Sequence, residues 1–191
     1  MILEKMKYCF LSFMKNTFFS NRKWIETNKV EKNELKKTIL AYMQSHHTVS
    51  LATERNGVPH AATVFYVNIG YQLYFLSSPT SRHAENLSHN PKVSATINED
   101  YSKWQLIKGI QMEGRVESVG GILENGRIAT AFLKKFPDVA DFLISPRKLG
   151  QAIAQKVAKV KFYKLIPARI YFIDNAQGFG KRNELTLSKQ A

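Results

Sequence analysis

The sequence lacks the features that mark disulfide-bonded or membrane-spanning chains. Among its 191 residues Cys9 is the sole cysteine, which excludes an internal disulfide and is typical of a reducing, cytoplasmic compartment. Lys5, Lys7 and Lys15 interrupt the apolar N-terminal residues, so the longest uncharged run is too short to span a bilayer. Residues 16–20 provide no convincing small-residue cleavage site, and we therefore expect no signal peptide.

Acidic residues are scarce relative to basic ones. The chain has 15 Asp and Glu against 28 Lys and Arg, a formal net charge of +13. This charge favours nucleic acid, an anionic membrane surface or a phosphate-bearing ligand as a partner, without choosing among them. The excess is spread along the chain, with net +4 in the first thirty residues and +9 in the remainder, so we do not expect a concentrated basic arm.

Length and pattern predict one domain over residues 31–191, preceded by a basic extension. We interpret residues 1–30 as disordered or weakly amphipathic. Contact with a membrane surface is the alternative role for this extension. The apolar side chains that would make this contact are Phe10, Leu11, Phe13 and Phe18.

Helical segments in the domain are separated by short β-rich runs. Asn56-Gly57 predicts a tight hairpin turn, because this pair readily adopts positive φ angles. Gly109 and Gly114 predict bends in one long strand. The pattern as a whole indicates class α+β, a six-stranded antiparallel barrel with flanking helices. We expect helices over residues 31–45, 81–88, 123–136 and 147–158, and strands over 48–54, 61–67, 72–76, 92–97, 104–119 and 159–174.

A run of hydroxyl residues after the third strand leads directly into Arg82 and a short helix. The hydroxyls belong to Ser77, Ser78, Thr80 and Ser81. A helix N-terminus offers free N–H groups to an anion, and an arginine can bind two phosphate oxygens. The stretch therefore predicts a phosphate site. The alternative is a hydroxyl that merely caps the helix, with Pro79 in the first turn and Arg82 as a solvated surface cation.

The order of these motifs resembles the pyridoxamine 5'-phosphate oxidase-like FMN-binding split barrels, and the resemblance runs over residues 31–174. In that family a Ser-Arg-Lys or related cluster after a strand binds the FMN phosphate. The similarity is closest to a small bacterial branch, the YhbP-like proteins. The motifs that carry it are Leu-Tyr-Phe-Leu-Ser-Ser at 73–78, Ser81-Arg82-His83-Ala84, Asn86-Leu87, Asn90-Pro91, residues 106–114 and Gly178-Phe-Gly-Lys181.

The resemblance implies an FMN-binding flavoprotein, an oxidoreductase that passes hydride or electrons through the flavin to a small molecule. It also implies a homodimer with FMN at the interface, to which Phe179 or Lys181 of the partner chain contributes. The implied cofactor contacts are Ala62, Thr63, Val64 and Phe65 beside the ring, Leu76, Ser77, Ser81, Arg82 and His83 at the ribityl-phosphate end, and Lys108.

Several positions depart from the family pattern. His83 stands at the usual phosphate-binding Lys, which predicts a weaker or pH-dependent phosphate contact. A cofactor-contacting Gln corresponds to Gly109, beside Lys108, and a family Trp corresponds to Ile173. Residues 178–182 replace the segment that binds pyridoxine phosphate in the oxidases, so we do not expect vitamin B6 oxidation.

Other functions remain as alternatives. A non-catalytic module on the same barrel could bind flavin or haem, and haem or a metal would draw on five histidines that lack the regular spacing of a zinc site. They are His46, His47, His60, His83 and His89, of which the first two are more typical of a helix end. Strand aromatics could stack single-stranded nucleic acid, although they are more typical of a core. No pattern for acyl transfer is present, so we assign no catalytic residue.

Overall fold

The computed structural model describes residues 31–139 and 158–187, together with positions 144, 145, 147, 151 and 155. Its contacts divide the chain into two units, Met1–Thr38 and Ile39–Ala191. The predicted extension over residues 1–30 and most of the predicted helix over residues 147–158 lie outside the described residues. A helix over residues 31–45 matches the first prediction.

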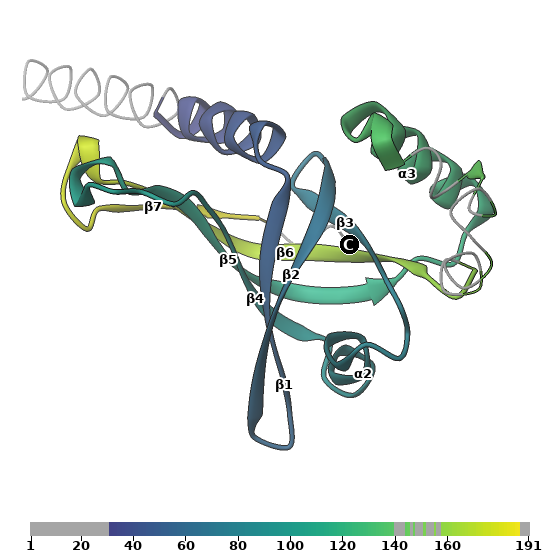
Figure 1. Cartoon of the computed structure of the whole chain (residues 1–191). Helices are drawn as coiled ribbons and strands as arrows, with labels where there is room; N and C mark the ends of the chain where they lie inside the picture. The colour runs from purple at the N-terminus through teal and green to yellow at the C-terminus, as the bar shows by residue number, and fades with distance from the viewer. Residues whose placement is uncertain are drawn as a thin grey trace, which may run out of the picture. The chain divides into compact units, whose positions relative to one another are not determined.

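Six antiparallel strands close into a barrel (Figure 1), which confirms the predicted fold class. Hydrogen-bonded neighbours follow the order β3-β2-β1-β4-β5-β6, and a pairing of β3 with β6 closes the ring. A seventh strand, which we did not predict, pairs with β6. The strands are β1 Thr48–Arg55, β2 Val58–Ile69, β3 Gln72–Ser77, β4 Lys92–Asn98, β5 Lys108–Ser118, β6 Lys161–Asp174 and β7 Arg182–Thr186.

Strand β2 changes its neighbour halfway along its length. It pairs with β1 from Val58 to Phe65, and with β3 from Tyr66 to Ile69. One backbone edge of the first half is therefore left without a strand partner in the described fold. The predicted tight turn between β1 and β2 is confirmed, because Asn56 and Gly57 have φ angles of 54° and 78°.

Gly114 allows β5 to bend against β6, as the sequence predicted. The register shifts between Glu113 and Gly114, and a Cβ on Gly114 would collide with the Ile166 carbonyl oxygen and lie 2.9 Å from Pro167 Cα. The predicted start of this strand at residue 104 was wrong, because Trp104–Leu106 forms a 3-10 helix. The carbonyl of Trp104 accepts a hydrogen bond from the Asn175 side chain instead of joining a ladder.

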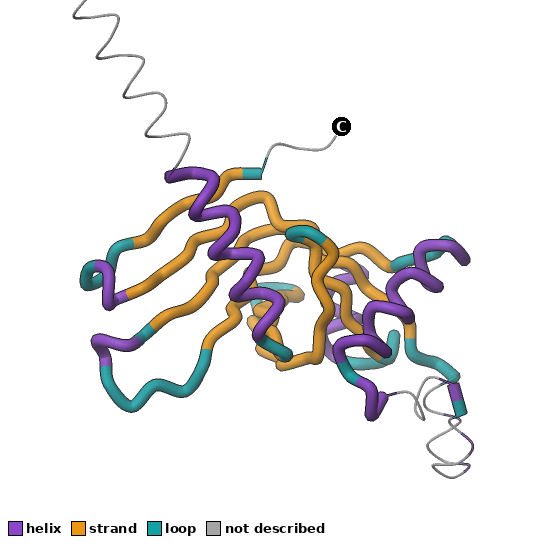
Figure 2. The backbone as a smooth tube through the Cα atoms, turned by 90° about the horizontal axis from the view of Figure 1, so that it is seen from above, coloured by secondary structure: helices purple, strands orange, loops and turns teal. Residues whose placement is uncertain are grey.

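Two helices flank the barrel wall (Figure 2), at the positions that the sequence predicted to within one residue. Helix α2, Arg82–His89, packs against β1. Helix α3, Ile122–Lys135, covers part of β2 and β3 through a cluster of four buried side chains. The cluster comprises Val67, Tyr74, Ile128 and Phe132. No helix in the described ranges is long and apolar enough to cross a membrane.

Candidate functional site

The segment between β3 and α2 is built around the Ser81 hydroxyl. Ser81 is the N-cap of α2, where its Oγ accepts a hydrogen bond from the Ala84 N–H at 3.4 Å. The same hydroxyl donates to the Ser78 carbonyl at 2.8 Å. The capping role proposed as an alternative is therefore present.

Ser77 and His83 meet beside this cap. Ser77 Oγ lies 2.6 Å from His83 Nε2 and 2.9 Å from Ser81 Oγ, while His83 Nε2 lies 3.2 Å from Ser81 Oγ. Burial lowers the pKa of His83, and the nearby charge of His60 lowers it further. The structure thus brings together three of the predicted cofactor residues, with the imidazole held toward its neutral form.

Free donors remain at the first turn of α2. The N–H groups of Ala84 and Glu85 bond to Ser81, whereas those of Arg82 and His83 make no hydrogen bond within the described chain. The Arg82 side chain is exposed. Two unpaired N–H groups at the positive end of a helix dipole, beside an exposed guanidinium, form an arrangement suited to a phosphate.

The predicted ring-contacting residues lie on the half of β2 whose second edge is unpaired. Ala62 and Val64 are half-buried and share a face with His60, while Thr63 and Phe65 point to the exposed face. Phe65 is 59% exposed, and its ring contacts that of Phe136 edge to face, with centroids 5.3 Å apart. This edge can therefore offer backbone N–H and C=O groups to a ligand.

Leu76 and Lys108 are not brought to the group of Ser77, Ser81 and His83, which we call the Ser77 cluster. The Leu76 side chain packs against the apolar cluster under α3, on the opposite face of β3 from Ser77. Lys108 pairs in register with Asp174, at one end of β6, and Ser77 pairs with Lys161 at the other end. Measured along the strand, this separation is on the order of 40 Å.

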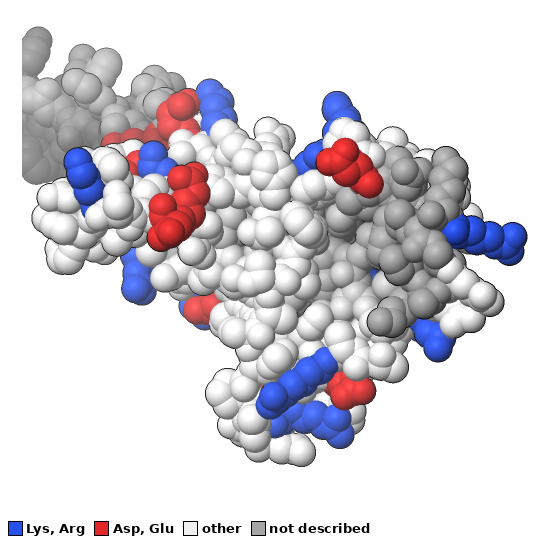
Figure 3. All heavy atoms as spheres, in the orientation of Figure 1, with Lys and Arg blue, Asp and Glu red and all other residues white. Residues whose placement is uncertain are grey.

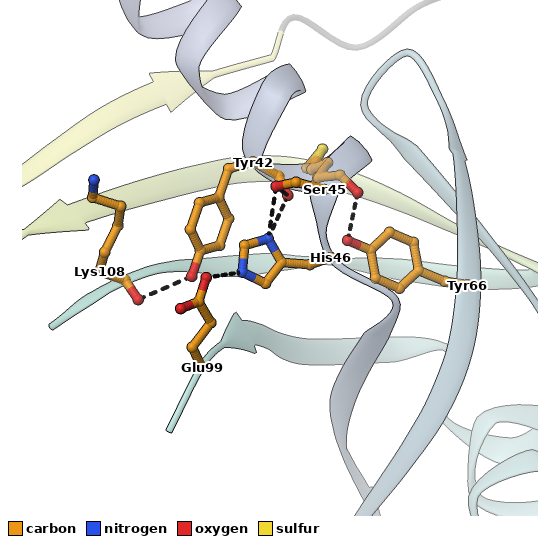
Figure 4. A network of polar contacts seen from close by, with 7 residues as sticks. Tyr42, Ser45, His46, Tyr66, Glu99 and Lys108 are labelled. Atoms are coloured by element: carbon orange, nitrogen blue, oxygen red, sulfur yellow. Dashed lines mark hydrogen bonds and ion pairs between the residues drawn. The ribbon is translucent and has the colours of Figure 1, made fainter. Parts of the chain in front are cut away.

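Lys108 instead belongs to a polar network at the end of the first helix (Figure 4). Its carbonyl accepts a hydrogen bond from the Tyr42 hydroxyl at 3.0 Å, which Figure 4 draws as a dashed line. Its ammonium pairs with Asp174 at 3.2 Å. The Tyr42 ring stacks on His46 with centroids 3.8 Å apart, and His46 Nε2 lies 2.7 Å from a Glu99 carboxylate oxygen. This network joins the helix end to the start of β5.

His46 ends the helix, as the sequence suggested. Its Nδ1 lies 2.7 Å from the Tyr42 carbonyl, one helical turn earlier. No group of three metal-ligating side chains occurs within the residues that the structure describes. The polar contacts of His46 therefore support a structural role.

His60 is the residue near the cluster that sequence reasoning did not place there. It lies two residues before Ala62 and therefore on the same face of β2 as Ala62 and Val64, so strand periodicity was the available signal. Its electrostatic effect on His83 depends on how α2 packs, which no local sequence pattern indicates.

On the face drawn in Figure 3, Lys and Arg side chains are dispersed with acidic side chains among them, so the positive charge of the chain is not gathered there into one patch.

Comparison with known proteins places this geometry in a family context. A family model described as pyridoxamine 5'-phosphate oxidase matches residues 35–174. A UPF0306 protein of Klebsiella pneumoniae is 28% identical over 143 residues, covering 74% of this chain and 86% of the relative. The UPF0306 protein YhbP of Escherichia coli O157:H7 is 26% identical over 146 residues, covering 75% of this chain and 88% of the relative.

Solved structures share the fold at lower identity. Campylobacter jejuni ChuZ superposes with a TM-score of 0.63 and 20% identity, covering 81% of this chain and 60% of that one. HutZ of Vibrio cholerae, described as a haem storage protein, gives a TM-score of 0.55 and 22% identity, covering 70% of this chain and 89% of that one. At these identities the likeness establishes the split-barrel fold alone.

Proposed function

The chain belongs to the pyridoxamine 5'-phosphate oxidase family, in its YhbP-like branch, and from that premise we propose that it is an FMN-binding oxidoreductase. The observation that carries the proposal is the start of α2, where two free N–H groups and an exposed arginine adjoin the Ser77 cluster. Bound FMN would supply the hydride and electron transfer.

The donor set fits a phosphate monoester. Arg82 supplies a permanent charge and a planar pair of donors, and the backbone N–H groups of Arg82 and His83 supply donors of fixed direction. The hydroxyls of Ser77 and Ser81 hold His83 in place through their hydrogen-bond contacts with Nε2. These side chains would bind and orient the cofactor through its phosphate.

The flavin ring would lie along the unpaired edge of β2. Residues Ala62 to Phe65 pair with β1 on one side only, so their outward backbone groups are available to the polar atoms of the ring. Phe65, exposed and braced by Phe136, would shield one side from water. Backbone contacts of this kind orient the ring without requiring particular side chains.

Lys108 could reach this cofactor only from a second copy of the chain. Because Ser77 pairs with one end of β6 and Lys108 pairs with the other, one chain cannot place both at one phosphate. We therefore propose a homodimer. Exposed apolar side chains near Lys108 would form the dimer interface. They belong to Trp104, Leu106, Ile107 and Phe179, whose exposed fractions are 55%, 53%, 42% and 80%.

A non-catalytic haem- or flavin-binding module is the second candidate. It is favoured by His83 and by His60, whose charge acts on His83, because imidazole is a common ligand of haem iron. The haem storage role in the description of HutZ also favours it. In this alternative the barrel would hold the group and have no substrate of its own.

The first experiment is a binding titration of the purified chain with FMN, riboflavin and haemin, followed by visible absorption and flavin fluorescence. We expect FMN to bind more tightly than riboflavin, and Arg82→Ala to abolish that preference. Arg55→Ala, at the exposed tip of the β1–β2 hairpin, is the matched control and should retain it. Equal FMN binding by wild type and Arg82→Ala would contradict the phosphate assignment, and binding of haemin alone would favour the second candidate.

Anaerobic reduction distinguishes an enzyme from a carrier. The FMN-loaded protein is mixed with a nicotinamide donor, and bleaching of the flavin band is followed before and after an acceptor is added. Reduction with turnover supports the oxidoreductase, whereas a loaded protein that is reduced by no nicotinamide donor supports the binding module.

A further inference from the structure

We propose that phosphate binding at the start of α2 is coupled to the uptake of one proton by His83, so that the site holds a phosphomonoester more tightly as the pH falls from 8.5 toward 6.5. This inference rests on the proposed function and concerns the regulation of the same site. It follows from the hydrogen-bond arrangement around one imidazole nitrogen.

The hydroxyl protons of the cluster can be assigned by elimination. Ser81 donates its proton to the Ser78 carbonyl, so its Oγ can only accept from Ser77 or His83. Ser77 then has one proton and two possible acceptors, His83 Nε2 at 2.6 Å and Ser81 Oγ at 2.9 Å. The Ser77 hydroxyl is therefore a two-position rotor between these acceptors.

A proton on Nε2 switches this rotor without leaving any group unpaired. When Nε2 is bare, Ser77 donates to it. When Nε2 carries a proton, His83 donates to Ser77 Oγ, and Ser77 turns its own proton to Ser81. Both arrangements satisfy the buried Ser77 hydroxyl, so the cluster can take up a proton at His83 without breaking its connections.

The charges around His83 favour the neutral imidazole until an anion arrives. Burial, and after it the charge of His60 on β2, keeps the pKa of His83 below its ordinary value. Arg82 on α2 and Lys161, the register partner of Ser77 on β6, add exposed positive charge. Glu85, one turn into α2, is exposed, and no carboxylate bonds to the cluster within the described residues.

A phosphate dianion reverses this balance. Its negative charge at the helix N-terminus favours an imidazolium beside it, so the pKa of His83 rises in the complex. Because binding and protonation are linked, each strengthens the other by the same factor. Uptake of one proton raises the affinity at most about tenfold per unit of falling pH. The phosphate group itself titrates near pH 6, so the linkage is measured above pH 6.5.

The test is a set of fluorescence titrations with FMN and riboflavin at pH 6.5, 7.5 and 8.5. We expect the dissociation constant for FMN to fall several-fold from pH 8.5 to 6.5, and that for riboflavin, which has no phosphate, to stay constant. His83→Gln should remove the pH dependence. His83→Lys, which keeps a positive charge throughout this range, should bind FMN tightly with little dependence on pH.

His60→Gln provides the matched control on β2. It removes the neighbouring charge and should keep the slope while shifting it to higher pH. Calorimetry of FMN binding to the wild-type chain in buffers of different ionisation enthalpy measures proton uptake directly, and so does not depend on any variant folding.

The possible outcomes distinguish proton-coupled phosphate binding from FMN binding itself. Tight FMN binding with no proton uptake, or with the same pH slope in His83→Gln as in wild type, overturns this inference and leaves the flavin assignment standing. Binding of neither FMN nor riboflavin at any pH overturns the proposed function, and this inference with it.

Discussion

Asn86 on α2 donates a hydrogen bond of 3.1 Å to the Thr53 hydroxyl on β1, and both side chains are buried. Thr53 in turn donates to the His60 carbonyl on β2 at 3.3 Å. Figure 1 shows α2 beside the hairpin of these two strands. One buried chain of hydrogen bonds therefore fixes the helix that carries Arg82 and His83 against the strand that carries His60.

Asn86→Ala should lower the free energy of unfolding by about 1–3 kcal/mol, because it leaves the buried Thr53 hydroxyl without its donor. The measurement is urea denaturation, with Asn98→Ala on the exposed end of β4 as the control. Combining Asn86→Ala with Thr53→Val should cost less than the sum of the two single changes. Strict additivity would show that the hydrogen bond contributes no coupling between helix and barrel.

Gly114→Ala should destabilise the barrel by about 1–3 kcal/mol, because the new methyl group would overlap backbone atoms of β6 that cannot rotate away. Gly126→Ala is the matched control. Gly126 lies within α3, and a Cβ added there would have no neighbouring atom within 4 Å outside the local helix backbone, so alanine should raise stability by about 0.5–1 kcal/mol. Thermal unfolding of both variants checks the two signs, and a neutral Gly114→Ala would contradict the close approach at the bulge.

Lys135 should make the stability of the protein rise with pH above 8. Its ammonium donates to the His46 carbonyl at 2.6 Å and to the Met43 carbonyl at 3.3 Å, and lies 4.3 Å from the Tyr66 ring centroid. Burial lowers the pKa of Lys135 from 10.5 to about 8. Between these values the unfolded chain holds a proton that the folded chain has released, so raising the pH favours the fold.

The measurement is urea denaturation of wild type and Lys135→Met at pH 7.0, 8.0 and 9.0. The stability of wild type relative to the variant should increase over this range. Burial raises the pKa of Tyr66 and Tyr42, which opposes the trend near pH 10, but both tyrosines are present in both proteins. A constant difference from pH 7.0 to 9.0 would show that Lys135 titrates at its ordinary value.

Phe179→Asp should convert the proposed homodimer into a monomer. Phe179 packs edge to face on Trp104 with centroids 5.2 Å apart, and its ring is mostly exposed, so a charge there would be buried in the interface at high cost. Light scattering after gel filtration measures the mass. Ile122→Asp on α3, where the side chain is 89% exposed, is the control and should stay dimeric. A monomeric wild type, or a dimeric Phe179→Asp, would contradict this interface.

Local chemistry explains what could be predicted. Three features depend on conformational preferences that act within a few residues. They are the Asn56-Gly57 turn, the start of α2 at the Ser81 cap and the bend at Gly114. The resemblance to the family rested on motifs of the same local kind. The 3-10 helix at Trp104–Leu106 was misjudged because its partner, Asn175, lies 71 residues away along the chain.

The sequence by itself predicted the barrel class, the limits of α2 and α3 to within one residue, and the hydroxyl and arginine residues of the proposed phosphate site, because periodicity and capping depend on neighbouring residues. The tertiary structure alone decided which of these residues meet. It placed His60 near His83, separated Leu76 and Lys108 from the cluster, and left one edge of β2 unpaired. The physical reason is that strand register and helix packing join residues far apart in the chain, and no local pattern encodes those distances.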